Sequence, residues 1–189
     1  MIYLNNYGWN DKLSQLKQES TYNALTHGRI SIVHRTCYEV VSENGLFQCE
    51  LTGNMMYGKS DFELPCTGDW VLFQPFDEHK GIIVDMLPRE RTLYRKKNGT
   101  VADKQAIASY VDKAFIVQSL DDNFNVRRAE RFMVQMQEEN INPVLVFNKA
   151  DLGFDEQKVE EQIRHIARQI PVFFTSIHQP QTILQLRES

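Results

Sequence analysis

The spacing of apolar residues changes character along the chain. In residues 8–20 the apolar side chains recur at helical spacing, and Asn10 or Asp11 stands where an N-cap is expected, which predicts a short helix. Between residues 28 and 87, short segments rich in valine, isoleucine and aromatic residues alternate with turn sequences. These segments predict strands at residues 28–35, 38–42, 46–52, 69–76 and 81–87. Five short strands in about sixty residues favour a small barrel of the OB type.

Beyond a turn-rich segment the pattern alternates between buried strand and amphipathic helix. Strands are expected at residues 111–120, 143–147 and 171–176, with helices at residues 125–140 and 155–169. Strand, helix, strand, helix, strand is half of a parallel α/β sheet. The fold class expected is therefore multi-domain, an all-β OB-type barrel followed by an incomplete α/β domain. The expected parts are a helical extension (1–25), the barrel (26–88), a linker (89–104) and the partial α/β domain (105–189).

Composition is that of a globular protein, with 42% hydrophobic and 24% charged residues in a chain of 189. No run approaches the roughly 18 apolar residues of a membrane helix, and the N-terminus does not resemble a signal peptide, so a cytoplasmic location is expected. The five histidines and three cysteines lack the spacing of zinc ligands, and we expect no metal site in this chain. The cysteines are expected to be reduced and mostly buried.

The net charge of −4 conceals one basic segment. Residues 86–104 contain six lysines or arginines against two acidic residues, whereas acidic residues predominate on both sides of them. Cationic side chains around an aromatic ring suit the phosphates and bases of RNA. RNA contact is therefore expected from Arg89, Arg91, Arg95, Lys96 and Lys97, with Tyr94 among them. The alternative is a solvated connector, or a segment paired with the acidic surfaces beside it.

A polar motif, Asn148-Lys149-Ala150-Asp151, follows the second parallel strand, at the end where open parallel sheets bind ligands. Guanine presents two adjacent donors, the ring N1–H and the exocyclic amino group, and the Asp151 carboxylate can accept both. Asn148 can bond the O6/N7 side of the base or tie neighbouring loops together, and the Lys149 stem can lie along the base. The competing interpretation is an ordinary Asx-turn or helix cap. After the next strand, the candidates for backbone contact with the base are Thr175, Ser176 and Ile177.

A second stretch, GNMMYGKS at residues 53–60, matches the phosphate-loop pattern G-x-x-x-x-G-K-[ST]. A phosphate loop must run into a helix N-terminus, and Pro65 leaves room for barely one turn before the next strand. None of the 9 glycines has an aspartate three residues before it, so the Asp-x-x-Gly element of a conventional order is missing. We therefore expect a barrel loop here. The alternative is a conventional-order P-loop NTPase that uses Lys59 and Ser60.

Four blocks resemble, in order, the RsgA (YjeQ) family of ribosome small-subunit-dependent GTPases, whose GTPase domain is circularly permuted. The blocks are residues 67–73, 87–99, 105–132 and 143–152. The resemblance implies a GTP hydrolase that binds GTP and GDP, with Mg²⁺ in the complete protein, and acts late in maturation of the small ribosomal subunit. It also implies contacts with ribosomal RNA from the barrel and from a zinc-binding tail. Ile177 departs from the family pattern, because alanine is usual there.

The resemblance further implies that the chain is an N-terminal fragment, with the phosphate loop, the magnesium-sensing element and the zinc tail expected beyond Ser189. Such a fragment is not expected to hydrolyse GTP alone, so no catalytic residue is expected in it. Its expected contributions are guanine specificity and docking to ribosomal RNA. The alternative is a non-enzymatic RNA-binding module whose half-sheet is a scaffold. The open edge of that half-sheet is expected to favour association.

Overall fold

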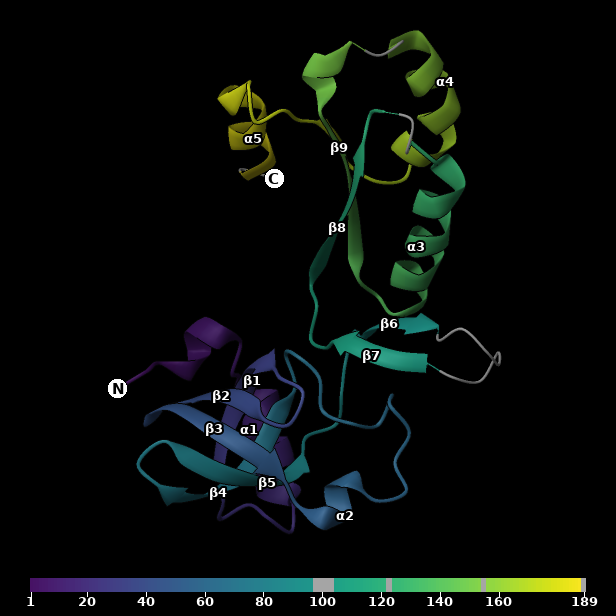
Figure 1. Cartoon of the computed structure of the whole chain (residues 1–189). Coiled ribbons are helices and arrows are strands. Elements are labelled where there is room, and N and C mark those ends of the chain that lie inside the picture. The colour runs from purple at the N-terminus through teal and green to yellow at the C-terminus, as the bar shows by residue number, and fades with distance from the viewer. Residues whose placement is uncertain (97–103, 122–123, 154–155, 188–189) are drawn as a thin grey trace. The chain divides into compact units, whose positions relative to one another are not determined.

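The computed structural model of the chain describes residues 1–96, 104–121, 124–153 and 156–187 (Figure 1). It divides into two compact units, Met1–Val111 and Asp112–Ser189. Within the described residues, no helix combines the length and the apolar character needed to cross a membrane.

The first unit is built on a closed five-stranded barrel. Its strands are β1 (Thr26–Val33), β2 (Tyr38–Ser42), β3 (Gly45–Leu51), β4 (Trp70–Asp77) and β5 (Lys80–Met86). They close in the order β1-β2-β3-β5-β4, with β3 and β5 parallel and the other pairs antiparallel. Alternate residues point inward and form the core, which includes Ile30, Val40, Phe47, Cys49, Val71, Phe73 and Ile83. The OB-type barrel expected from the sequence is thus confirmed.

The N-terminal segment covers part of the outer barrel surface. It consists of a 3-10 turn, η1 (Leu4–Tyr7), and the expected helix α1 (Asp11–Glu19). Asn10 is the N-cap, since its Oδ1 accepts a hydrogen bond of 3.1 Å from the Leu13 backbone N–H. The buried side chains of this segment pack in one cluster with Trp70, which is 1% exposed and hence a core residue.

The basic segment expected to be a linker is instead paired within the first unit. Strand β6 (Leu93–Lys96) runs antiparallel to β7 (Lys104–Ala108), and Ala108 forms a parallel bridge with Thr67 beside the barrel. Along the chain, the first compact unit ends at Val111 and the second begins at Asp112, whereas the sequence predicts that the α/β domain begins at residue 105. The reason is that residues 104–108 find their hydrogen-bond partners in the basic segment and in Thr67.

The second unit is an α/β domain with a parallel sheet, as the sequence predicts. Its elements are β8 (Lys113–Ser119), α3 (Val126–Glu138), β9 (Asn142–Asn148), η2 (Ala150–Leu152), α4 (Glu156–Ala167), β10 (Val172–Phe174) and α5 (Pro180–Arg187). The strands form a parallel sheet in the order β10-β9-β8. Helices α3 and α4 lie on one side of the strands and α5 on the other (Figure 1).

Helix α5 was not predicted, and its short length and high exposure explain why. It is eight residues long, and both Ile183 and Leu184 are exposed, at 42% and 56%. A short helix that buries so little has no clear apolar face for a periodicity argument to detect.

The three cysteines are free, with Cys49 and Cys66 buried, as expected.

Candidate functional site

The predicted guanine-binding residues lie together at the carboxyl-terminal end of the parallel sheet, where the three strands end. Ser119 at the end of β8 pairs with Asn148 at the end of β9. The Thr175 N–H donates to the Phe147 carbonyl at 2.7 Å, and the Ala150 N–H donates to the Thr175 carbonyl at 3.1 Å. The loops after β9 and β10 are therefore joined by backbone hydrogen bonds, which hold the intervening side chains in place.

Asp151 lies in the 3-10 turn η2, with its carboxylate exposed. Its Oδ1 accepts a hydrogen bond from the hydroxyl of Ser176, a residue that is itself fully buried. This hydrogen bond lowers the pKa of Asp151, because it favours the charged form. Among the described residues, the side chain that bonds to this carboxylate belongs to the loop after β10. Asp151 is thus an ionised, oriented hydrogen-bond acceptor at the carboxyl-terminal end of the sheet.

Lys149 has a left-handed backbone conformation, with φ of 63°. Its Nζ donates to Oδ2 of Asp121 at 2.9 Å, and Oδ1 of Asp121 accepts from the Ser119 hydroxyl at 2.9 Å. Sequence reasoning missed Asp121. The signal that could have revealed it is a carboxylate two residues after the first parallel strand, because that position reaches the same sheet edge as the Asn-Lys-x-Asp motif.

The side chain of Asn148 contacts the loop that follows β10. Its Oδ1 accepts a hydrogen bond of 3.4 Å from the Thr175 hydroxyl, whose side chain is buried. Ile177, by contrast, is 73% exposed. The buried polar side chains of Thr175 and Ser176 therefore build the loop, while Ile177 extends away from it.

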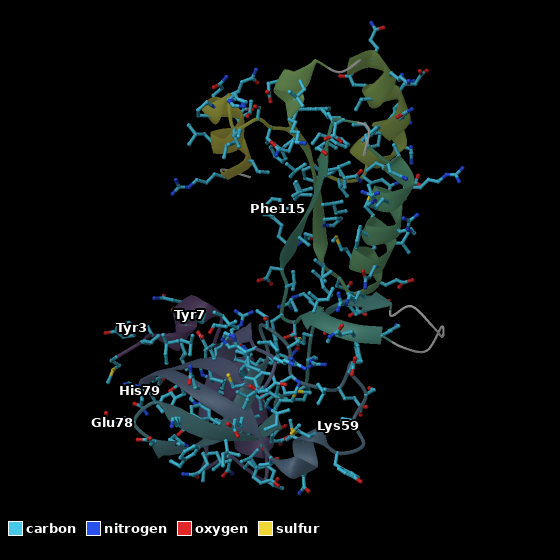
Figure 2. All side chains as sticks on the ribbon, viewed as in Figure 1. Tyr3, Tyr7, Lys59, Glu78, His79 and Phe115 are labelled. Atoms are coloured by element: carbon cyan, nitrogen blue, oxygen red, sulfur yellow. The ribbon has the colours of Figure 1, made fainter. Side chains whose placement is uncertain are left out.

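The GNMMYGKS stretch has none of the structure of a phosphate loop. A single helical turn, α2 (Gly53–Met56), comes before the glycine-lysine pair, and Gly58 takes a φ of 75°. The backbone N–H and the hydroxyl of Ser60 both donate to Glu63 Oε2, at 2.9 and 2.7 Å. No helix begins between Ser60 and β4, a segment that is described throughout. The expectation of a barrel loop is confirmed, because Lys59, labelled at this loop in Figure 2, is not followed by a helix before β4.

Among the basic residues, Arg89 is engaged inside the first unit. Its guanidinium forms a bidentate ion pair with Asp69, with Nε at 2.9 Å from Oδ1 and Nη2 at 2.6 Å from Oδ2. It also donates to the carbonyls of Phe62 and Leu64. The two charged side chains are 10% and 1% exposed. Arg89 therefore holds the segment before β4 against the barrel, and its donors face away from solvent.

The other basic residues differ in exposure. Arg91 pairs with its neighbour Glu90 at 3.3 Å. The exposed Arg95 donates through Nε to Oε1 of Gln105 across the hairpin, at 2.9 Å. Lys96 ends β6, and Lys97 lies outside the described residues. The Tyr94 ring has the Lys104 ammonium 4.1 Å from its centroid, so this ring already binds a cation.

The described residues contain no group of three or more histidine, cysteine, aspartate or glutamate side chains placed to hold a metal ion. An exposed carboxylate such as that of Asp151 can accept hydrogen bonds from two adjacent N–H groups, the arrangement that guanine presents. The OB-type barrel is followed by a parallel sheet with polar loops at its carboxyl-terminal end. This arrangement is that of a protein that joins a barrel to a GTPase-like domain. The model of the RsgA GTPase family matches residues 86–189, and the chain belongs to this family.

Relatives with curated descriptions agree with this assignment. The chain is 73% identical over 183 residues to the small ribosomal subunit biogenesis GTPase RsgA 1 of Bacteroides thetaiotaomicron, covering 97% of this chain and 52% of that protein. It is 33% identical over 168 residues to RsgA of Methanosarcina acetivorans, covering 87% of this chain and 44% of that protein. The chain thus spans about half the length of the relatives it matches.

Two solved structures share the fold. YjeQ from Thermotoga maritima superposes with a TM-score of 0.62 at 24% identity, over 86% of this chain and 56% of that one. YloQ, described as a circularly permuted GTPase, gives a TM-score of 0.57 at 21% identity, over 88% and 57%. The fold class inferred from the sequence, a barrel followed by a permuted GTPase-like sheet, is therefore confirmed.

Proposed function

We propose that this chain is the guanine-reading and RNA-docking part of a GTP-binding factor that acts in biogenesis of the small ribosomal subunit. GTP hydrolysis, Mg²⁺ binding and zinc binding are assigned to segments that the longer relatives have in addition. The support for the subunit as partner is the description of the relatives, above all the one that is 73% identical.

The guanine-reading role rests on one observation, the exposed Asp151 carboxylate held by the Ser176 hydroxyl. A carboxylate that is already oriented loses little side-chain entropy when it accepts two hydrogen bonds from a base. Adenine presents no such donor pair, so its binding would desolvate the carboxylate without compensation. Asn148 and Lys149 support the loop from the side of β8 and β10, through Thr175 and Asp121.

The RNA-docking role rests on the charge contrast between the basic segment and the acidic barrel. Arg95 is exposed on β6, and Arg91, Lys96 and Lys97 are the other proposed contacts. We leave out Arg89, because its guanidinium is occupied by Asp69 and two backbone carbonyls. Charge reversal at Arg95, Lys96 and Lys97 together should lower RNA affinity and flatten its dependence on salt, and unchanged binding would remove this role.

The test of guanine recognition uses titration with fluorescent GDP and GTP. The chain alone should bind weakly or not at all. A chimera that extends it with the remaining half of the Bacteroides thetaiotaomicron relative should bind GDP in preference to ADP. In the chimera, Asp151→Asn should reduce that preference by about five- to 150-fold, since one bidentate contact discriminates by about 1–3 kcal/mol.

Lys59→Ala is the matched control in the same chimera, because Lys59 belongs to the barrel loop. It should leave GDP affinity unchanged. The opposite pattern, with nucleotide binding lost in Lys59→Ala and kept with full guanine preference in Asp151→Asn, would refute the proposal.

The open sheet edge supports a further proposal, that the isolated chain associates with itself. Among the described strands, β8 is at the edge of its sheet, and Phe115 and Val117 on it are 48% and 61% exposed. Figure 2 shows Phe115 on the side of β8 away from α3. Exposed apolar residues on an edge strand favour association. Sedimentation across a concentration series should detect it, and Phe115→Lys should weaken it.

A further inference from the structure

Lys149 is held from one side by the loop that follows β8. Its Nζ donates to Oδ2 of Asp121 at 2.9 Å, and Oδ1 of the same carboxylate accepts from the Ser119 hydroxyl at 2.9 Å. The backbone joins the same two loops, because the Leu120 N–H donates to the Asn148 carbonyl at 2.9 Å. Asp121 therefore links the end of β8 to the motif that follows β9.

The backbone of Lys149 has an unusual conformation, with φ of 63° and ψ of 35°. This left-handed region costs free energy for a residue with a Cβ, and glycine or asparagine adopts it more readily. A lysine at such a position indicates that its side chain has a role. The turn leads from β9 into η2, which carries Asp151. The motif is thus held from β8 through Asp121 and from β10 through Ser176.

The ion pair between Lys149 and Asp121 contributes little to the stability of the fold. The two side chains are 50% and 29% exposed, and exposed pairs have small effects on the free energy of unfolding. A lysine side chain nevertheless has a large rotamer entropy, which is lost when the side chain becomes ordered. If the free protein already orders it, ligand binding does not bear that loss. The contact therefore matters for ligand affinity more than for folding.

The pairing also determines which part of Lys149 can meet a ligand. Asp121 compensates the ammonium charge, and both oxygens of its carboxylate already accept hydrogen bonds from the chain. A carboxylate repels the phosphates of a nucleotide, so Asp121 is not suited to contact them. Because the ammonium group is held at the loop after β8, the methylene stem is the part of Lys149 that is left to pack on a base.

We propose that Asp121 is a positioning residue for nucleotide binding, which acts by fixing the stem of Lys149 before the base arrives. The inference rests on the guanine-reading part of the proposed function and deepens it. A stem packs on the face of any purine, so Asp121 raises affinity without selecting guanine. Selection belongs to Asp151, whose carboxylate meets the edge of the base. The two carboxylates at this end of the sheet thus have separate effects, on affinity and on discrimination.

The test compares GDP with inosine diphosphate, which lacks the exocyclic amino group of guanine, in the chimera with the Bacteroides thetaiotaomicron relative. Asp121→Ala should weaken the binding of both nucleotides by the same factor, about two- to tenfold, the loss expected for one long side chain that must be ordered on binding. The ratio of the two affinities should stay unchanged. Asp121→Asn keeps an acceptor for Lys149 and should lose less. Glu138→Ala removes an exposed carboxylate at the end of α3, at the opposite end of the sheet, and should have no effect.

A double-mutant cycle tests whether Asp121 acts through Lys149. Lys149→Met removes the ammonium group and keeps most of the stem, so it should weaken GDP binding as much as Asp121→Ala does. The double variant should lose no more than either single variant. Carbon-13 relaxation of the Lys149 methylene groups measures their ordering in the 189-residue chain without nucleotide. Their mobility should increase in Asp121→Ala, whereas the carboxyl signal of Asp151 should not move.

An Asp121→Ala effect that persists at full size in the Lys149→Met background would mean that Asp121 contacts the nucleotide directly, and the inference would be wrong. A changed ratio of GDP to inosine diphosphate affinity, or unchanged Lys149 mobility, would overturn it as well. Each of these results leaves guanine preference to Asp151 and the proposed function intact. A chimera that binds GDP no better than ADP would instead refute the guanine-reading part of the proposed function, and this inference with it.

Discussion

The hydroxyl of Ser176 donates a hydrogen bond to Oδ1 of Asp151, a residue 25 positions earlier in the chain. The two residues follow different parallel strands, β10 and β9, which lie side by side in the sheet. Ser176 is fully buried, whereas the carboxylate that it holds is exposed. A rigid donor beneath an exposed acceptor fixes the direction in which that acceptor can bind a ligand.

Ser176→Ala should raise the pKa of Asp151 toward its ordinary value. The hydrogen bond from Ser176 is the largest cause of the lowered pKa, and its loss removes the preference for the charged form. Carboxyl-carbon NMR titration of the 189-residue chain measures this directly. Ser14→Ala, which removes a hydroxyl on α1, should leave the Asp151 titration unchanged. An unaltered pKa in Ser176→Ala would show that the carboxylate is oriented by something else.

Arg89→Met should destabilise the barrel by about 3–5 kcal/mol, because it leaves the carboxylate of Asp69 buried without its partner. Urea unfolding measures this loss. Lys12→Met is the control, since Lys12 pairs with Glu90 at the surface, where the side chains are 68% and 31% exposed. An exposed pair contributes about 0–1 kcal/mol. Equal losses in the two variants would contradict the structural role assigned to Arg89.

Gly68→Ala should be severely destabilising, by about 2–4 kcal/mol. Gly68 has a φ of 94°, and a Cβ there would lie 2.3 Å from the Ser109 carbonyl oxygen, at the residue that follows β7. The matched control is Gly53→Ala in α2, where φ is not positive and no atom lies within 4 Å of the added methyl group. Denaturant unfolding of both variants compares them. Similar stabilities would mean that the hairpin does not depend on this close approach.

The barrel should lose stability as the pH falls below about 6.5, the ordinary pKa of histidine. His27 packs against Trp9, with 4.1 Å between ring centroids, and its buried Nε2 has no hydrogen-bond partner among the described residues. Burial lowers the pKa of His27, with a smaller contribution from Lys17. The unfolded chain therefore binds a proton before the folded chain does, so the free energy of unfolding decreases from pH 6.5 down to the folded pKa.

Urea unfolding at a series of pH values between 7 and 5 tests this dependence. His27→Gln should flatten the pH profile, whatever its effect on absolute stability. His79→Gln, which removes an exposed histidine in the turn after β4, should leave the profile as it is. A profile that His27→Gln does not change would assign the pH dependence to other groups.

Most elements of both units were predictable from the sequence because their signals are local, whereas β6, β7 and α5 were not. Alternating apolar residues identified the barrel strands, and helical spacing identified α1, α3 and α4. The Asn-Lys-x-Asp motif was readable for the same reason, since it directly follows a buried strand. Pro65 also sufficed to reject the phosphate-loop pattern, because a proline limits the length of any helix before it.

Only the tertiary structure decided which charged side chains are buried in ion pairs and which are exposed to solvent. Arg89 and Arg95 belong to one basic segment, yet one is buried against Asp69 and the other is exposed on β6. The pairing of β6 with β7, the bond from Ser176 to Asp151 and the bond from Lys149 to Asp121 join residues distant in the chain. Burial and partnership depend on such long-range contacts. Periodicity reports only which face of an element is apolar and carries no information about what covers it.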